Sequence, residues 1–168
     1  MADDDGIDFA LAAFRESGEW QLEELSHDHL GDVDAIAAAL QRLPGDDGAL
    51  AMVSVDEDFF VLVRVVGAGT RVLLSDVTAA EEWELASSVV EHLGLPDPDE
   101  DDEPAPAGDL ALLVDLGVPA DDLGELLDDE ELVPEDALYE IAGELGFADL
   151  FDEVLDDSLD GSLDPRPV

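Results

Sequence analysis

The chain has 168 residues, of which 47 are acidic and only 5 are basic, and its formal net charge at pH 7 is −42. A surface this anionic repels nucleic-acid phosphates and anionic lipids and attracts basic proteins. The absence of cysteine excludes disulfides, zinc–thiolate sites and cysteine nucleophiles. Because the N-terminus is acidic and no apolar run is long enough to span a bilayer, we expect a cytoplasmic protein without membrane or direct nucleic-acid partners.

Residues 1–95 predict a domain of the α+β class, with an antiparallel sheet and the element order ββαβββα. Alternating apolar residues over 7–13 predict the first strand, Ser17-Gly18 predicts a turn, and a second strand returns from Trp20. Apolar residues at helical spacing over 33–43 predict a helix. Three strand-like runs follow, at Leu50–Val55, Phe59–Val66 and Arg71–Leu74. The short segments between these runs predict consecutive hairpins, with Gly67-Ala68-Gly69 as one turn.

A helix closes this predicted domain. Thr78 and Glu81 have the spacing of a capping box, which predicts that the helix begins there, and Gly94 suits its end. The apolar stripe of this helix is Trp83, Ala86, Val89, Val90 and Leu93.

The remainder of the chain is more acidic, since residues 96–168 hold 26 acidic residues and one arginine. Prolines and carboxylates over 96–107 predict an extended acidic linker. Residues 108–155 predict a small module of short helices, the first around Leu110–Val114, with Gly117 and Gly146 as terminators. Each apolar stripe is too narrow to stand alone, so these helices should pack on each other or on the first domain. Residues 156–168 are predicted to be a disordered tail.

Carboxylates are so abundant that their spacing singles out no catalytic pair. Pairs such as Asp121-Asp122 and Asp128-Asp129 are typical of a solvated helix face, and we assign no catalytic residue and no cofactor-binding residue. Phosphate-binding loops are not indicated either, because Gly67-Ala68-Gly69 lacks the later glycine and helix that a nucleotide cradle needs.

Two motifs resemble fragments of metal sites. In an extended chain, the imidazoles of His27-Asp28-His29 point to one side and could share a metal, but two ligands are also compatible with an ordinary polar loop. The sequence Asp156-x-Ser158-x-Asp160-Gly161 imitates the start of a calcium loop, but its twelfth position is Pro167 instead of glutamate. We therefore assign no metal ligand and expect no cofactor.

Several strings along the chain resemble the actinobacterial family of tRNA adenosine deaminase-associated proteins. They include the run 58–65, the run 70–80, Leu93-Gly-Leu-Pro, Gly108-Asp-Leu and Leu145-Gly-Phe, and the resemblance covers residues 7–155. It implies association with the deaminase and brings no catalytic residues. The chain is not itself a deaminase of the zinc class, because it has neither the H-x-E motif nor the cysteines of that site.

The charge and the resemblance predict a non-catalytic acidic accessory protein that binds a basic protein partner, with a tRNA adenosine deaminase as the candidate. An alternative is a nucleic-acid mimic that regulates another nucleic-acid-binding protein. A metal-binding protein or enzyme using His27 and His29, and acidity that serves solubility or salt adaptation alone, are two further alternatives.

Overall fold

The computed structural model describes residues 7–25, 33–43, 48–55, 59–66, 69–81, 83–95, 106–128 and 133–154. The strands are β1 (Ile7–Glu16), β2 (Glu19–Glu24), β3 (Ala49–Val55), β4 (Phe59–Val66), β5 (Gly69–Leu74) and β6 (Ala107–Gly108). The α-helices are α1 (Val33–Gln41), α2 (Glu84–Leu93), α3 (Ala120–Asp128) and α4 (Pro134–Leu145). The 3₁₀ helices are η2 (Val77–Glu81) and η3 (Val114–Leu116).

The strands form one sheet in the order β2-β1-β3-β4-β5-β6, and every neighbouring pair is antiparallel. The predicted α+β class with an antiparallel sheet is therefore confirmed. The first hairpin has the predicted turn, because Glu16 pairs with Glu19 and positive φ angles at Ser17 (56°) and Gly18 (83°) close a two-residue loop. This backbone geometry matches the twist of the two strands.

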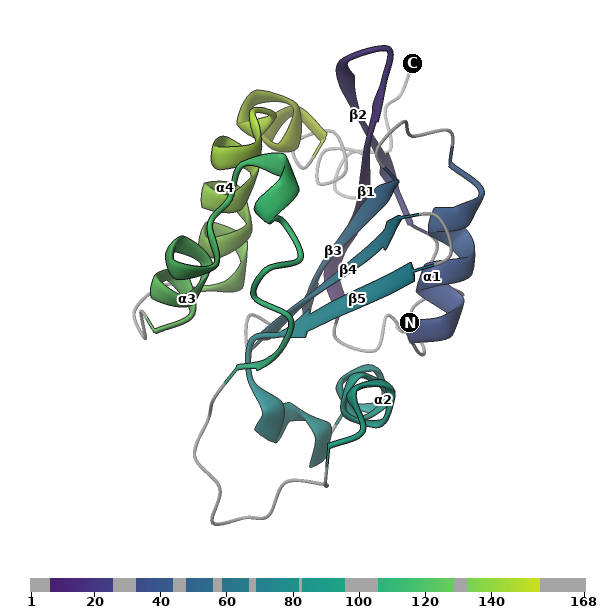
Figure 1. Cartoon of the computed structure of the whole chain (residues 1–168), viewed down its shortest axis with the longest axis vertical. Helices are drawn as coiled ribbons and strands as arrows, with labels where there is room; N and C mark the ends of the chain where they lie inside the picture. The colour runs from purple at the N-terminus through teal and green to yellow at the C-terminus, as the bar shows by residue number, and fades with distance from the viewer. Residues whose placement is uncertain are drawn as a thin grey trace, which may run out of the picture.

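Helices cover both faces of the sheet, so the molecule has three layers, as Figure 1 shows. Successive side chains of a strand point to opposite faces, and the central strands β3 and β4 are buried on both. One core lies between the sheet and helices α1 and α2, with Val53, Val61 and Ile36 among its members. The other lies between the sheet and helices α3 and α4, where Leu62 and Ile141 are buried.

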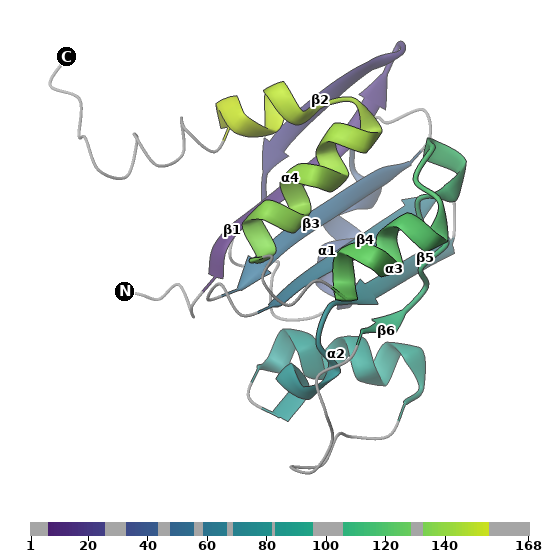
Figure 2. The same cartoon turned by 90° about the vertical axis from the view of Figure 1, so that its left-hand side faces the viewer.

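The C-terminal helices α3 and α4 lie across one face of the sheet (Figure 2). They pack against each other and against the strands, as their narrow apolar stripes predict. A further helical stretch over 148–154 continues this layer, and Phe147 and Phe151 are buried in the same core. Among the described helices, none is long and apolar enough to cross a membrane.

The helix predicted to begin at Thr78 begins later in the structure. Residues 77–81 form the 3₁₀ helix η2, and α2 begins at Glu84. Asp76 Oδ1 accepts hydrogen bonds from the Thr78 backbone N–H (2.9 Å) and from the Thr78 hydroxyl (2.6 Å), so the side chain of Thr78 does not cap a helix that starts there. Trp83 is the N-cap residue of α2 and packs on Phe59, with ring centroids 6.1 Å apart.

The helix predicted around Leu110–Val114 is also wrong, because turns over 110–113 lead into the short η3. Asp109 Oδ1 accepts the Ala111 backbone N–H at 2.9 Å, which favours a turn over a regular helix. Ala107, the last residue of the expected linker, lies in β6. Gly94, Gly117 and Gly146 end their elements with positive φ, as predicted.

Candidate functional site

Three of the five arginines lie on one face and at one end of the sheet. Arg64 of β4 and Arg71 of β5 are direct cross-strand partners. Arg15 lies two residues beyond Ala13, whose side chain belongs to the core under α3 and α4, so strand alternation puts Arg15 on that same face. Its guanidinium lies 5.4 Å from the centre of the Trp20 ring. Like charges directly opposite in a sheet repel, so this arrangement requires compensating groups.

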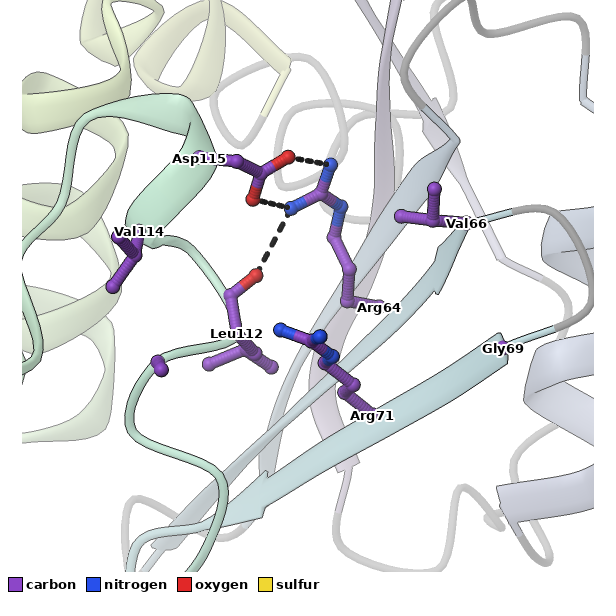
Figure 3. Close-up of a pocket in the computed structure, with 8 residues that line it drawn as sticks. Arg64, Val66, Gly69, Arg71, Leu112, Val114 and Asp115 are labelled. Atoms are coloured by element: carbon purple, nitrogen blue, oxygen red, sulfur yellow. Dashed lines mark hydrogen bonds and ion pairs between the residues drawn. The ribbon is translucent and has the colours of Figure 1, made fainter.

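Asp115 and a backbone carbonyl compensate Arg64. The Arg64 side chain is only 2% exposed, and its Nη1 and Nη2 donate to the two carboxylate oxygens of Asp115 at 2.8 and 3.0 Å. Nη1 also donates to the Leu112 carbonyl at 2.9 Å (Figure 3). This bidentate pair attaches the segment before α3 to the C-terminal part of β4.

The hydrogen bonds from Arg64 hold the pKa of the Asp115 carboxyl below its ordinary value. Partial burial opposes this shift, and the positive charges of Arg64 and Arg71 reinforce it. Asp115 is therefore a carboxylate at neutral pH and stays charged in moderately acidic solution.

Arg71 is held more loosely than Arg64. Its Nε lies 3.5 Å from Asp109 Oδ2, and the two side chains are 58% and 39% exposed. Asp109 directly follows β6, and its backbone N–H donates to the Val72 carbonyl at 2.9 Å. The preceding Gly108 has a φ of 123°, and a Cβ there would overlap the Val72 carbonyl oxygen, so only glycine lets β6 approach β5 this closely.

A pocket of about 510 Å³ lies between the two arginines and the 111–115 segment. Its lining is mixed, with the two arginines and Val66 on the sheet and Val114 on the segment that faces them (Figure 3). Val66 and Val114 are 48% and 49% exposed there, although they are large apolar residues. A pocket of this size with a few convergent polar groups is typical of a ligand site.

The comparisons with known proteins give a consistent answer. A family model described as Rv3753c-like tRNA adenosine deaminase-associated protein matches residues 8–148. The chain belongs to this family. The chain is also 38% identical over 151 residues to Protein Rv3753c of Mycobacterium tuberculosis (strain ATCC 25618 / H37Rv), which covers 88% of this chain and 87% of that protein. No solved structure matches.

Family membership confirms the resemblance predicted from the sequence strings. The two motifs that resemble metal sites are not tested, because His27-Asp28-His29 and Asp156–Gly161 lie outside the described residues. Within the part of the chain that the structure describes, no group of three or more metal-ligating side chains comes together. His92 is the basic residue in the last turn of α2, a position that suits such a side chain.

The acidic residues of this family member are distributed unequally between the two helical layers. Helix α1 carries one acidic residue and α2 carries two, whereas α3 and α4 carry four each. Residues 120–154 contain no arginine, lysine or histidine at all. The acidic side chains of α4 are exposed, and the buried side chains of this helix are apolar. We call the outer surface of α3, α4 and 148–154 the acidic face.

Proposed function

We propose that this chain is a non-catalytic accessory protein of the cytoplasm that binds a basic protein, and that this partner is a tRNA adenosine deaminase. The observation that carries the proposal is the acidic face, present on a chain whose family is named for association with that enzyme. A protein that binds tRNA needs a basic surface for the phosphates, and such a surface complements the acidic face.

The proposed contact is electrostatic, and this dictates how it should behave. Long-range attraction speeds the encounter between the two proteins and weakens as salt screens it. If the acidic face covers the basic surface that holds tRNA, tRNA competes with this chain for the deaminase. Binding without competition would place the contact elsewhere on the enzyme.

The test is calorimetric titration of the purified full chain into purified deaminase at several salt concentrations, with and without tRNA. The variant Asp136→Asn/Glu140→Gln/Glu144→Gln removes three charges that are four residues apart and form one exposed stripe of α4. We expect it to weaken binding by about 10-fold at low salt and to reduce the salt dependence.

A matched control removes three charges from the opposite layer. The variant Asp34→Asn/Glu84→Gln/Glu91→Gln removes the same number of negative charges as the α4 variant, but from α1 and α2. We expect it to weaken binding much less than the α4 variant does. Equal losses in the two variants would mean that net charge alone, and not the acidic face, attracts the partner. No binding at low salt would contradict the deaminase as partner and would direct the search to the nucleic-acid mimic alternative.

A further inference from the structure

The two edges of the sheet differ in their chemistry. The β2 edge carries exposed Glu19, Glu23 and Glu24, and charged side chains of this kind discourage the addition of another strand. At the opposite edge, β6 pairs with Leu73 and Leu74 of β5. Among the described residues no strand pairs with the N-terminal half of β5 on this side, so this half forms an edge beyond the end of β6.

The backbone groups of Thr70 point away from the sheet at this edge. The Val72 carbonyl accepts a hydrogen bond from Asp109, so the backbone groups of Val72 face away from β4. Because the direction of these groups alternates along a strand, the N–H and C=O of Thr70 face the same way as those of Val72. They form a donor and an acceptor to which another extended chain can pair.

Arg71 lies beside this edge, and the two terminal nitrogens of its guanidinium are the groups that matter here. Asp109 lies on the Nε side of its guanidinium, and among the described residues none makes a hydrogen bond with its two terminal nitrogens. These nitrogens lie at the pocket, with the exposed Val66 and Val114 in its walls (Figure 3). Gly69 pairs with Val66 and has no side chain, so the surface next to Val66 is open on this face.

We propose that the free part of the β5 edge and the adjoining pocket bind an extended segment of a partner protein by strand addition. The backbone of the segment pairs with Thr70, and a carboxylate side chain faces Arg71. An apolar residue two positions away, next to Gly69, packs into the pocket between Val66 and Val114. Strand pairing supplies affinity, and the alternate side chains supply specificity.

The net charge of −42 narrows the chemistry of the segment further. A strongly anionic ligand would be repelled by the protein as a whole, whereas one carboxylate among neutral residues can accept hydrogen bonds from the terminal nitrogens of Arg71, whose Nε side faces Asp109. The free backbone edge favours a peptide over a small anion, because a small anion cannot use the Thr70 donor and acceptor together.

The test is an NMR titration of the isotope-labelled full chain with the synthetic peptide Ac-Thr-Val-Thr-Glu-Thr-Val-Thr-NH₂. This peptide puts one carboxylate between two valines on one face of a strand. We expect millimolar-range binding, shifts of the amide signals of residues 69–72 and 111–115, and slower exchange of the Thr70 amide. The same peptide with glutamine in place of glutamate should bind about 3- to 10-fold more weakly, because Arg71 is partly exposed.

Two variants separate the backbone contact from the charge contact. Thr70→Pro removes the outward N–H and should abolish peptide binding; an edge strand tolerates proline at such a position. Thr70→Ala keeps the N–H, so this variant should bind the peptide like the parent chain. Arg71→Gln should remove the preference for the glutamate peptide, and Arg42→Gln on the far layer should not. The spectrum of each free variant away from residues 69–72 confirms that it is folded.

Three results would overturn the proposal. The first is unchanged peptide binding by the Thr70→Pro variant. The second is equal affinity of the parent chain for the two peptides. The third is reproduction of the same amide shifts by acetate alone, which would make the pocket a small-anion site. None of these experiments involves the deaminase, so they test the β5 edge independently of the proposed function.

Discussion

The asymmetry between Arg64 and Asp115 leads to a prediction about which partner can be removed at lower cost. Arg64 is 2% exposed and Asp115 is 61% exposed. The change Asp115→Ala deletes both hydrogen bonds to the carboxylate and leaves a buried guanidinium with its contact to the Leu112 carbonyl. The change Arg64→Met instead removes the buried charge and leaves a carboxylate that water can solvate.

The magnitudes follow from this difference in exposure. Removing one partner of a fully buried ion pair costs about 3–5 kcal/mol of the free energy of unfolding. Because water reaches the Asp115 side of this pair, we expect Asp115→Ala to cost about 2–3 kcal/mol, within the range for hydrogen bonds to charged groups. An apolar side chain of similar length replaces a buried charge at little cost, but the Leu112 carbonyl loses its donor, so we expect about 1 kcal/mol for Arg64→Met.

The assay is urea unfolding followed by tryptophan fluorescence. Trp20 donates its indole N–H to the Leu145 carbonyl at 3.1 Å and reports on the layer of α4, while Trp83 reports on the layer of α2. The double variant should be about as stable as Arg64→Met alone. Arg71→Gln, in the exposed neighbouring pair, is the control and should cost no more than about 0.5 kcal/mol. An Arg64→Met variant that loses as much stability as Asp115→Ala would refute the reasoning.

Four further predictions concern pH, close packing, one indole and salt. The pKa of Asp115 is lower in the folded than in the unfolded state, so its ion pair adds to the free energy of unfolding fully above the unfolded pKa, and this stabilisation is lost as pH falls through the folded pKa. Urea unfolding at decreasing pH should show this loss of stability in the parent chain and not in Asp115→Ala. Gly108→Ala should cost about 3 kcal/mol or more in urea unfolding, whereas Gly117→Ala, which has a similar φ but open space, should cost about 1 kcal/mol; equal costs would count against the close contact. Trp20→Phe should cost about 1–2 kcal/mol because the Leu145 carbonyl loses its donor, and thermal unfolding should show no loss if that bond is unimportant. The melting temperature should rise from low to moderate salt as screening reduces repulsion among 47 carboxylates, and a flat response would show that this repulsion is small.

Local signals in the sequence predict much of the fold. Ser17-Gly18 between two alternating runs predicts the first hairpin, and Gly146 predicts the end of α4, because the residues that decide these features are neighbours along the chain. The predicted start of α2 at Thr78 is wrong because the local sequence is compatible with two different hydrogen-bond arrangements. The capping-box spacing suggests a helix, but the nearby Asp76 carboxylate accepts the Thr78 hydrogen bonds instead.

The candidate site is not predictable in the same way. Arg64 is a lone charge in the apolar run 59–66, and that is a signal that it needs a partner when buried. Its partner lies 51 residues away among 26 acidic residues of the second segment, and nothing in the local sequence distinguishes Asp115 from the others. Gly108-Asp109 is visible as a family string, but its approach to β5 depends on a pairing that only the folded chain shows.

The unequal numbers of acidic residues in the two helical layers also have an electrostatic consequence. With eight acidic residues on α3 and α4 and three on α1 and α2, the helices contribute an electric dipole moment roughly along the sheet normal. In the field of a cationic surface, this contribution favours orientations in which α4 approaches first and α1 faces the solvent. For the basic partner proposed above, fewer encounters would then begin with the wrong face.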